Sequence, residues 1–139
     1  MKHLQTHISQ NLTQKIFVVL KPGFMNLSQI IINIFKENGW EVEKTVVKKL
    51  LPQEACELYK VHAKEEFYKP LCEYMCSDIC RAFIFTKPGI QTKKTFTEVK
   101  EIKDKIREEY GESDMRNVLH SSDSEKNMEA EASIFFYDI

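Results

Sequence analysis

The sequence lacks a long apolar run. No stretch of its 139 residues approaches the ~20 apolar residues that a transmembrane helix needs. Residues 1–14 also lack the apolar core of a secretory signal, and we expect them to form a polar N-terminal arm. These absences predict a cytoplasmic protein that has no membrane partner.

The sequence also lacks an excess of either charge. It has 20 basic and 21 acidic residues, which give a formal net charge of −1. A chain this close to neutral is not expected to bind nucleic acid non-specifically, although local basic pockets stay possible. An RNA-binding module would also need a strand motif of basic and aromatic residues, which the sequence does not have.

Cysteines are few, and they do not form a metal-binding pattern. Three of the four, Cys72, Cys76 and Cys80, recur every four residues and would follow one stripe of a helix. No second cluster or pair of histidines completes a set of four ligands, and the cysteine density does not suit a disulfide framework. Together with Cys56, these residues are expected to be buried free thiols in a reducing compartment, with no metal held by side chains alone.

What is present is the pattern of one α/β domain over residues 15–139. Apolar runs predict strands at 15–20, 40–50, 80–86 and 133–137. Periodicity and turn residues predict helices after Ser28, after Leu51, over 68–77, over 91–109 and from Ser122. The order favours a ferredoxin-like α+β sandwich, in which a four-stranded antiparallel sheet has helices packed on one face.

One segment, "MRNVLHSSDSE" at 115–125, has features of a reactive site. His120 follows a short strand or turn and precedes a helix start predicted by the capping box of Ser122 and Glu125. Helix starts attract phosphate, and a neutral imidazole is a good nucleophile. Glu131 could return to hold the second ring nitrogen. A surface histidine in a polar loop is the alternative that the local pattern leaves open.

Other candidate residues could complete a phosphate site. Lys21 ends the first strand and could direct a cation into a cleft, whereas Arg107 and Arg116 could each clamp a phosphate. Tyr59 could belong either to the core or to the site, and Phe67 could stack on a base or pack in the core. For each cation, a solvated surface position is the alternative.

Several segments together resemble the nucleoside diphosphate kinase family. "RNVLHSSDSE" is similar to the family signature of asparagine, two apolar residues, histidine, glycine, serine, aspartate and serine. "FVVLKPG" resembles its opening strand, "YKVHAKEEFYKPLCEYMCSD" its tyrosine-x-x-histidine segment, "KIREEYG" its arginine run, and "EAEASIFF" its last helix and strand. The resemblance follows the family order over about residues 15–137, and it implies the same ferredoxin-like fold.

The resemblance implies a ping-pong phosphotransferase. His120 would take the terminal phosphate of ATP or another nucleoside triphosphate and pass it to a nucleoside diphosphate, with Mg²⁺ bridging the nucleotide phosphates. Lys21 would contact phosphate and ribose, Arg107 phosphate, Asn117 the sugar and Phe67 the base, whereas Tyr59, Ser122 and Glu131 would support or orient the histidine. A homo-oligomer is expected, either a hexamer or tetramer as in the family or a dimer.

The chain also departs from the family pattern. Gly23 replaces an aspartate, Ser121 replaces a glycine beside the histidine, and Glu108 and Glu109 follow the arginine. Residues 87–105 are shorter than the family segment that supplies an arginine and a threonine to the phosphates, and Lys93 or Lys94 could substitute for that arginine. The alternative function is therefore a kinase-fold module that binds nucleotide or a protein partner with little or no turnover.

Overall fold

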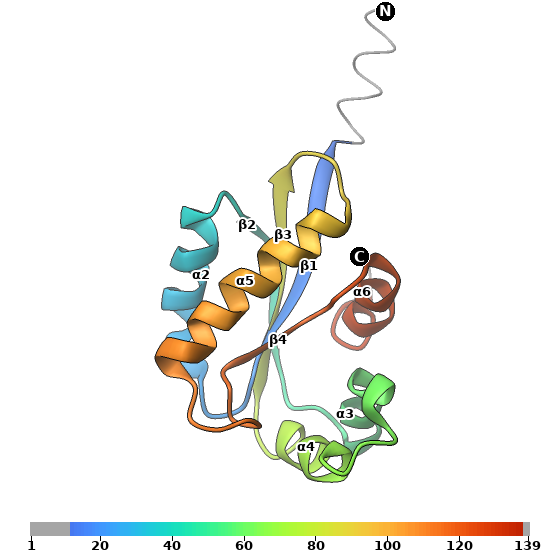
Figure 1. The fold of residues 1–139 in the computed structure, drawn as a ribbon. Coiled ribbons are helices and arrows are strands. Elements are labelled where there is room, and N and C mark those ends of the chain that lie inside the picture. The colour runs from blue at the N-terminus through green and yellow to red at the C-terminus, as the bar shows by residue number, and fades with distance from the viewer. Residues whose placement is uncertain (1–11, 138–139) are drawn as a thin grey trace, which may run out of the picture.

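The computed structural model describes residues 12–137, which fold around a four-stranded sheet in the order β2-β3-β1-β4. The strands are β1 (Thr13–Leu20), β2 (Glu41–Lys48), β3 (Cys80–Pro88) and β4 (Leu119–Ser121). Every pairing is antiparallel, and Val19 of β1 lies opposite both Ala82 of β3 and His120 of β4. The predicted antiparallel sheet is confirmed (Figure 1).

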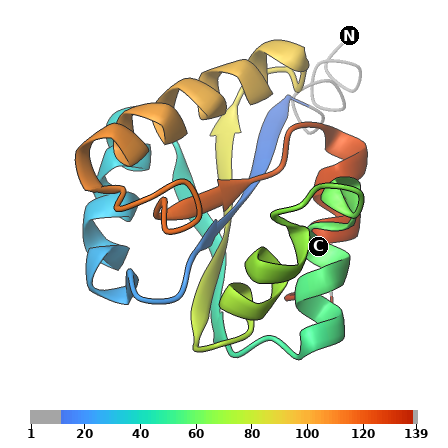
Figure 2. The ribbon, with the colours of Figure 1, turned by 60° about the horizontal axis from the view of Figure 1, so that its bottom comes forward.

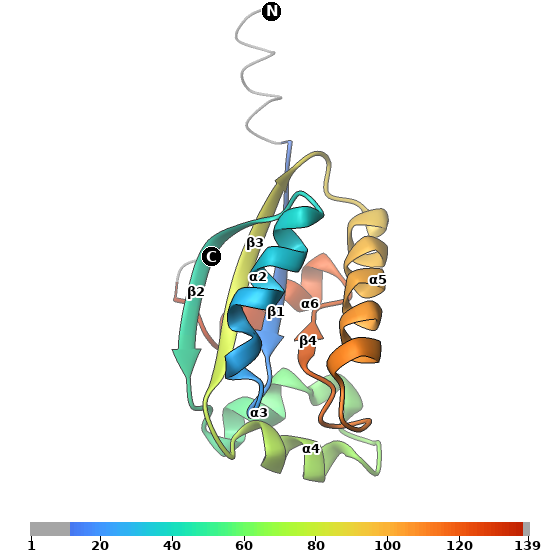
Figure 3. The same ribbon diagram turned by 90° about the vertical axis from the view of Figure 1, so that its left-hand side faces the viewer.

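Helices cover both faces of this sheet. One face carries α2 (Ser28–Glu37) and α5 (Lys93–Tyr110), and the other carries α3 (Pro52–Leu58), α4 (Tyr68–Met75) and α6 (Glu125–Ala132) (Figures 2 and 3). Short 3₁₀ turns, η1 (Met25–Leu27) and η2 (Lys60–His62), precede α2 and follow α3. The expectation that helices lie on one face only is therefore wrong.

Strand β1 explains why both faces need a cover. Ile16 and Val18 point into the core under α2 and α5, whereas Phe17 and Val19 point into the core under α3, α4 and α6. Successive side chains of a strand alternate between faces, so the continuous apolar run of β1 must be buried on both sides. On the α2 side, Phe85 stacks on Phe35 with ring centroids 4.6 Å apart.

The prediction of a C-terminal strand at 133–137 is wrong. Turns follow α6 there, and Phe135 packs on Phe17 with centroids 5.6 Å apart without joining the sheet. The fourth strand is instead the three-residue β4, and His120 is its central residue. The last helix begins at Glu125 and is capped by Ser124, whose Oγ accepts a hydrogen bond from the Asn127 amide at 3.2 Å, rather than by Ser122.

Three remaining expectations have different outcomes. Most of the proposed arm 1–14 lies outside the described residues, and β1 begins within it at Thr13. All four cysteines are free, but only Cys72 and Cys80 are buried, whereas Cys56 and Cys76 are partly exposed. Cys80 opens β3 and so does not continue a helical stripe from α4. Over residues 12–137, no helix is both long and apolar enough to span a bilayer.

Candidate active site

A cavity of about 590 Å³ lies beside β4 and contains most of the predicted site residues. The segments that surround it are the end of β1, the connection from α3 into α4, the C-terminal half of α5, the loop from α5 to β4, and α6 with the turn before it. Its lining includes Lys21, Tyr59, Phe67, Arg107, Asn117, His120 and Glu131. Residues that are up to 110 positions apart in the chain therefore meet in one place.

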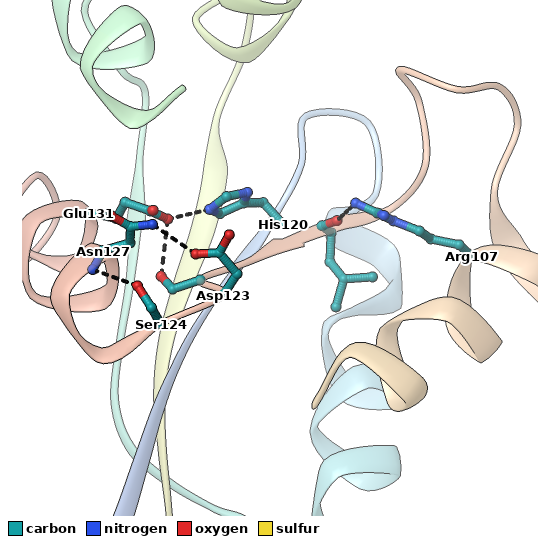
Figure 4. Close-up of polar contacts among 8 residues, drawn as sticks. Arg107, His120, Asp123, Ser124, Asn127 and Glu131 are labelled. Carbon is teal, nitrogen blue, oxygen red and sulfur yellow. Dashed lines mark hydrogen bonds and ion pairs between the residues drawn. The ribbon is translucent and has the colours of Figure 1, made fainter. Parts of the chain in front are cut away.

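His120 is held by a buried carboxylate. Its Nε2 donates a hydrogen bond to Oε1 of Glu131, and that oxygen also accepts the hydroxyl of Ser122 at 3.0 Å (Figure 4). Glu131 reaches the histidine because α6 packs against β1 and turns this side chain back toward β4. Since Nε2 carries the proton, Nδ1 is the nitrogen with a free lone pair, and the described residues provide it with no hydrogen-bond partner.

The surroundings of His120 favour the neutral imidazole. Burial lowers the pKa of His120, and the nearby charges of Lys21 and Lys103 lower it further, whereas Glu131 raises it. Tyr59 packs edge-on against the imidazole, with ring centroids 5.0 Å apart. The ring is thus fixed in orientation and tautomer, as a nucleophile that attacks a phosphorus atom requires.

Two cations lie close to His120. The ammonium of Lys21, only 3% exposed, donates to the Met115 carbonyl at 3.2 Å and lies 5.8 Å from the centre of the Tyr59 ring. Arg107 donates through Nη2 to the Leu119 carbonyl at 2.8 Å. Burial, with the charge of Arg107, lowers the pKa of Lys21 to about 7. Carbonyl oxygens position both side chains without neutralising them, and Lys21 is a cation chiefly below about pH 7 unless a bound anion stabilises its charged form.

A strained turn leads into β4. Val118 has a φ of +80°, and the Leu119 amide donates to the Asn117 carbonyl at 3.1 Å around it. This is a γ-turn of a kind that is rare for a β-branched residue. Val118 is fully buried, and its carbonyl accepts the Lys21 amide at 2.8 Å, so packing and β1 hold the turn in place. Backbone strain of this kind often occurs at functional sites.

Three buried polar atoms of the cavity lack a hydrogen-bond partner. They are the Tyr59 hydroxyl, Nε of Arg107 and Oδ1 of Asn117. Buried polar atoms in native proteins are nearly always paired, so orphans that gather at one site indicate a place where a polar ligand binds. Asn117 itself is fixed by a 2.8 Å bond from Nδ2 to the Asp114 carbonyl.

The mouth of the cavity is aromatic. Phe67, which directly precedes α4, is 47% exposed, and its ring lies 5.3 Å from that of His62. Val61 beside it is 62% exposed. An exposed aromatic face at the rim of a polar cavity can stack on a planar base. Phe67 is thus a surface residue of the cavity rather than a core residue.

Two predicted phosphate-binding residues lie elsewhere. Arg116 is not in the cavity lining: its guanidinium pairs with Glu112 at 3.0 Å and lies over the rings of Phe24 and Tyr74. Its Nη2 would lie 2.7 Å from a Cβ added at Gly23, where φ is +91° and an aspartate would be strained. Lys94 is exposed in the first turn of α5, outside the cavity, so its expected role is not supported.

The other departures from the family pattern do not block the cavity. Ser121 lies in the lining, and its backbone has a negative φ that does not require glycine. Glu108 and Glu109 are exposed on α5 and do not line the cavity. The segment that includes 87–105 forms the end of β3 and most of α5, which runs unbroken to Tyr110 and carries Arg107 in its last turn.

The sequence patterns missed several residues of the lining. Lys103 lies one turn before Arg107 on α5, a spacing of four that could have placed it on the same face. Asp123 and Asn127 also line the cavity, and they bond to one another at 2.8 Å (Figure 4). Among the described residues, no group of three histidine, cysteine or acidic side chains could hold a metal ion by itself.

The sequence matches a known family over nearly all of its length. A family model described as "Nucleoside diphosphate kinase" matches residues 14–139. The chain belongs to the nucleoside diphosphate kinase family. The nucleoside diphosphate kinase of Prosthecochloris aestuarii is 31% identical over 130 residues, which cover 88% of this chain and 92% of that one. That of Kosmotoga olearia is 29% identical over 135 residues, 88% of each chain.

Solved nucleoside diphosphate kinases have the same fold. The crystal structure of the Encephalitozoon cuniculi enzyme aligns with a TM-score of 0.79 at 21% identity, over 90% of each chain. The Aquifex aeolicus enzyme aligns with a TM-score of 0.75 at 23% identity, over 89% of this chain and 95% of that one. The ferredoxin-like α+β fold is confirmed, and the family relationship identifies the protein as a phosphotransferase.

Proposed function

We propose that this kinase transfers the terminal phosphate of a nucleoside triphosphate, such as ATP, to a nucleoside diphosphate through a phosphohistidine at His120. The observation that carries the proposal is the pairing of Nε2 with the buried Glu131, which leaves Nδ1 as the nucleophilic nitrogen beside Lys21 and Arg107. A histidine in this tautomer can accept a phosphoryl group without first losing a proton.

In the first half-reaction, Nδ1 forms a bond to the terminal phosphorus of the donor, and the bond from that phosphorus to the bridging oxygen breaks. The electron pair of the broken bond leaves with the nucleoside diphosphate. Lys21 and Arg107 offset the charge that collects on the phosphate oxygens, and Glu131 stabilises the positive charge of the phosphorylated ring. The second half-reaction reverses these steps with a different nucleoside diphosphate.

The same cavity offers contacts to the rest of a nucleotide. The exposed ring of Phe67 would stack on the base, and the orphan amide oxygen of Asn117 would accept a hydrogen bond from a sugar hydroxyl. The ammonium of Lys21, which the Met115 carbonyl positions, would contact both sugar and phosphate. Because stacking alone does not distinguish one base from another, we expect nucleotides with several different bases to bind.

Mg²⁺ would enter with the nucleotide phosphates. Mg²⁺ prefers oxygen ligands and keeps several waters, so it often binds through substrate phosphates and one or two carboxylates. The cavity lining suits such a bound ion, because it contains the carboxylate of Asp123. Only Oδ1 of this carboxylate accepts a hydrogen bond from Asn127, so Oδ2 is available to the ion. The bound ion would neutralise phosphate charge, while the side chains of this chain orient the phosphates toward His120.

The decisive test is phosphate exchange between ATP and a deoxynucleoside diphosphate. We expect wild-type protein incubated with γ-labelled ATP to gain acid-labile phosphate, and His120→Ala to gain none. Label that persists in His120→Ala would contradict the proposal. If nucleotide raises the melting temperature but transfer stays at background, the alternative of a binding module without turnover would be correct.

We propose that the protein forms a homo-oligomer. The edge strand β2 has one open side, and its Val42 and Val47 are 38% and 50% exposed. An open edge with apolar side chains tends to pair with another chain. Light scattering should give a mass of a dimer or larger, and Val47→Lys should lower it; a monomeric wild type would contradict the proposal.

We also propose a cytoplasmic location. All four cysteines have free thiols, and burial raises the pKa of Cys72 to about 11 and that of Cys80 to about 12, which keeps both protonated. Thiols persist in reducing compartments and are usually paired outside them. Cell fractionation should recover the protein with cytoplasmic markers, and a secreted pool would contradict this.

A further inference from the structure

Lys103 occupies the junction of two cavities. It lines the cavity that contains His120, and it also lines a second cavity of about 660 Å³ between α5 and the start of α6. Ser121 and Asp123 are the other residues shared by both linings. Lys103 lies one helical turn before Arg107, so the two cations share the face of α5 that is directed toward β4.

Lys103 lies near the carboxylates of Asp104 and Asp123 but forms a salt bridge with neither. Over residues 12–137 it forms no ion pair, whereas Lys100, one turn earlier, pairs with Asp104 at 2.8 Å. Burial, with the charges of Arg107 and Lys100, lowers the pKa of Lys103 to about 8, although Asp104 and Asp123 oppose this shift. Lys103 is in turn close enough to lower the pKa of Lys21 and that of His120. A half-buried cation that faces other cations is unfavourable unless an anion joins them.

The other lysines of α5 do not reach His120. Lys94 and Lys105 are exposed and line neither cavity, and Lys93 and Lys100 line only the second. All of α5 lies within the described residues, so this comparison covers the whole helix. Lys93 and Lys94, which the sequence suggested as substitutes for the family arginine, therefore lie too far from the cavity of His120 to replace it.

We infer that Lys103 is a phosphate-contacting residue, which binds the donor phosphates beside His120 in place of the cation that the shortened segment does not supply. This inference rests on the proposed function. When the Nδ1–phosphorus bond forms and the bridging oxygen leaves, negative charge spreads over the transferred group and the leaving diphosphate. The ammonium of Lys103 is a compact charge that offsets it, and Arg107 adds a second one.

The test compares Lys103→Met with Lys105→Met, which removes the same charge from an exposed position of the same helix. We expect Lys103→Met to lower kcat/KM for ATP by on the order of 10- to 100-fold, as for loss of a hydrogen bond to a charged group. Lys105→Met should stay near wild type, and Lys103→Arg should recover most of the loss. Urea unfolding of each variant checks that the fold is intact.

A pH profile separates contact with phosphate from a structural role. Because kcat/KM reports the ionisation of the free enzyme, the wild type should lose activity first as Lys21 deprotonates near pH 7 and further as Lys103 deprotonates near pH 8. Lys103→Arg should lack the second loss. Equal kcat/KM values for Lys103→Met and Lys105→Met, or parallel pH profiles for wild type and Lys103→Arg, would overturn the inference.

Nucleotide binding distinguishes failure of this inference from failure of the proposed function. If wild type transfers no phosphate but Lys103→Met still weakens ATP binding by calorimetry, and Lys105→Met does not, the contact stands and the kinase reaction is wrong. If wild type transfers phosphate and Lys103→Met both binds and transfers as Lys105→Met does, the kinase reaction stands and the contact is wrong.

Discussion

Replacing Glu131 with glutamine should test the central arrangement of the site. The carboxylate is 8% exposed, and its Oε1 accepts hydrogen bonds from both His120 Nε2 and the Ser122 hydroxyl. An amide oxygen can still accept these bonds and has nearly the same shape. The substitution therefore removes the negative charge and leaves the packing in place.

The size of the effect follows from that charge. A hydrogen bond to a charged group contributes about 1.5–3 kcal/mol, and a neutral one about 0.5–1.5 kcal/mol. The difference is about 1–2 kcal/mol in a site where the phosphorylated ring is positive, which predicts a rate of phosphohistidine formation about 5- to 30-fold lower. Because Glu131 raises the pKa of His120, the variant should also titrate its histidine at lower pH.

Single-turnover phosphorylation by ATP measures this rate directly, and NMR titration of the imidazole measures the pKa. Glu129→Gln is the matched control, since Glu129 is exposed on the same helix. If Glu131→Gln were phosphorylated as fast as Glu129→Gln and its histidine titrated like wild type, the reasoning from the buried carboxylate would be refuted.

Three further predictions concern the cations, the rim and the core. Because the pKa of Lys21 is lowered from 10.5 to about 7, the unfolded chain binds more protons than the folded protein between these pH values. The free energy of unfolding of the ligand-free protein should therefore rise with pH in this range, by up to about 1.4 kcal/mol per pH unit. Urea unfolding measures this rise, which should be smaller in Lys21→Met. Phe67→Ala should weaken nucleotide binding by about 1–3 kcal/mol in calorimetry, whereas Ile90→Ala, exposed outside the cavity, should not. Phe85→Ala, which removes a fully buried ring stacked between two others, should cost about 3–5 kcal/mol of unfolding free energy in urea, and a loss below 1 kcal/mol would contradict the described core.

A strand could be predicted from the sequence where it is long enough and buried enough to give a continuous apolar run. Residues 16–20 of β1 are all apolar because this part of the strand is central and covered on both faces. The run at 133–137 is equally apolar, but its Phe135 fills the core from a turn, and nothing local distinguishes the two cases. The true fourth strand has three residues and a histidine at its centre, too short for an alternating pattern.

Residues of the cavity lining could be predicted where a motif fixes their positions, and could not where only the fold does. The order of the motifs predicts His120, Glu131 and Lys21 as candidates, and all three line the cavity. Lys103 was missed because its helix carries five lysines, and only the packing of α5 against β4 selects one of them. Arg116 was a reasonable candidate by sequence, but the rings beneath it and Glu112 hold it outside the cavity.

The cavity combines features that each cost stability in the ligand-free protein. Lys21 is buried and repels the half-buried Lys103 and Arg107, the Tyr59 hydroxyl has no partner among the described residues, and Val118 is held in a strained turn. A core built only for stability would avoid all of these. A chain of phosphates would offset the cations and bond to the orphan donors, so the same groups that destabilise the empty fold would stabilise the complex. Because a ligand that binds only the native state adds to its stability, nucleotide should raise the melting temperature most where this repulsion is greatest, below the pKa of Lys21.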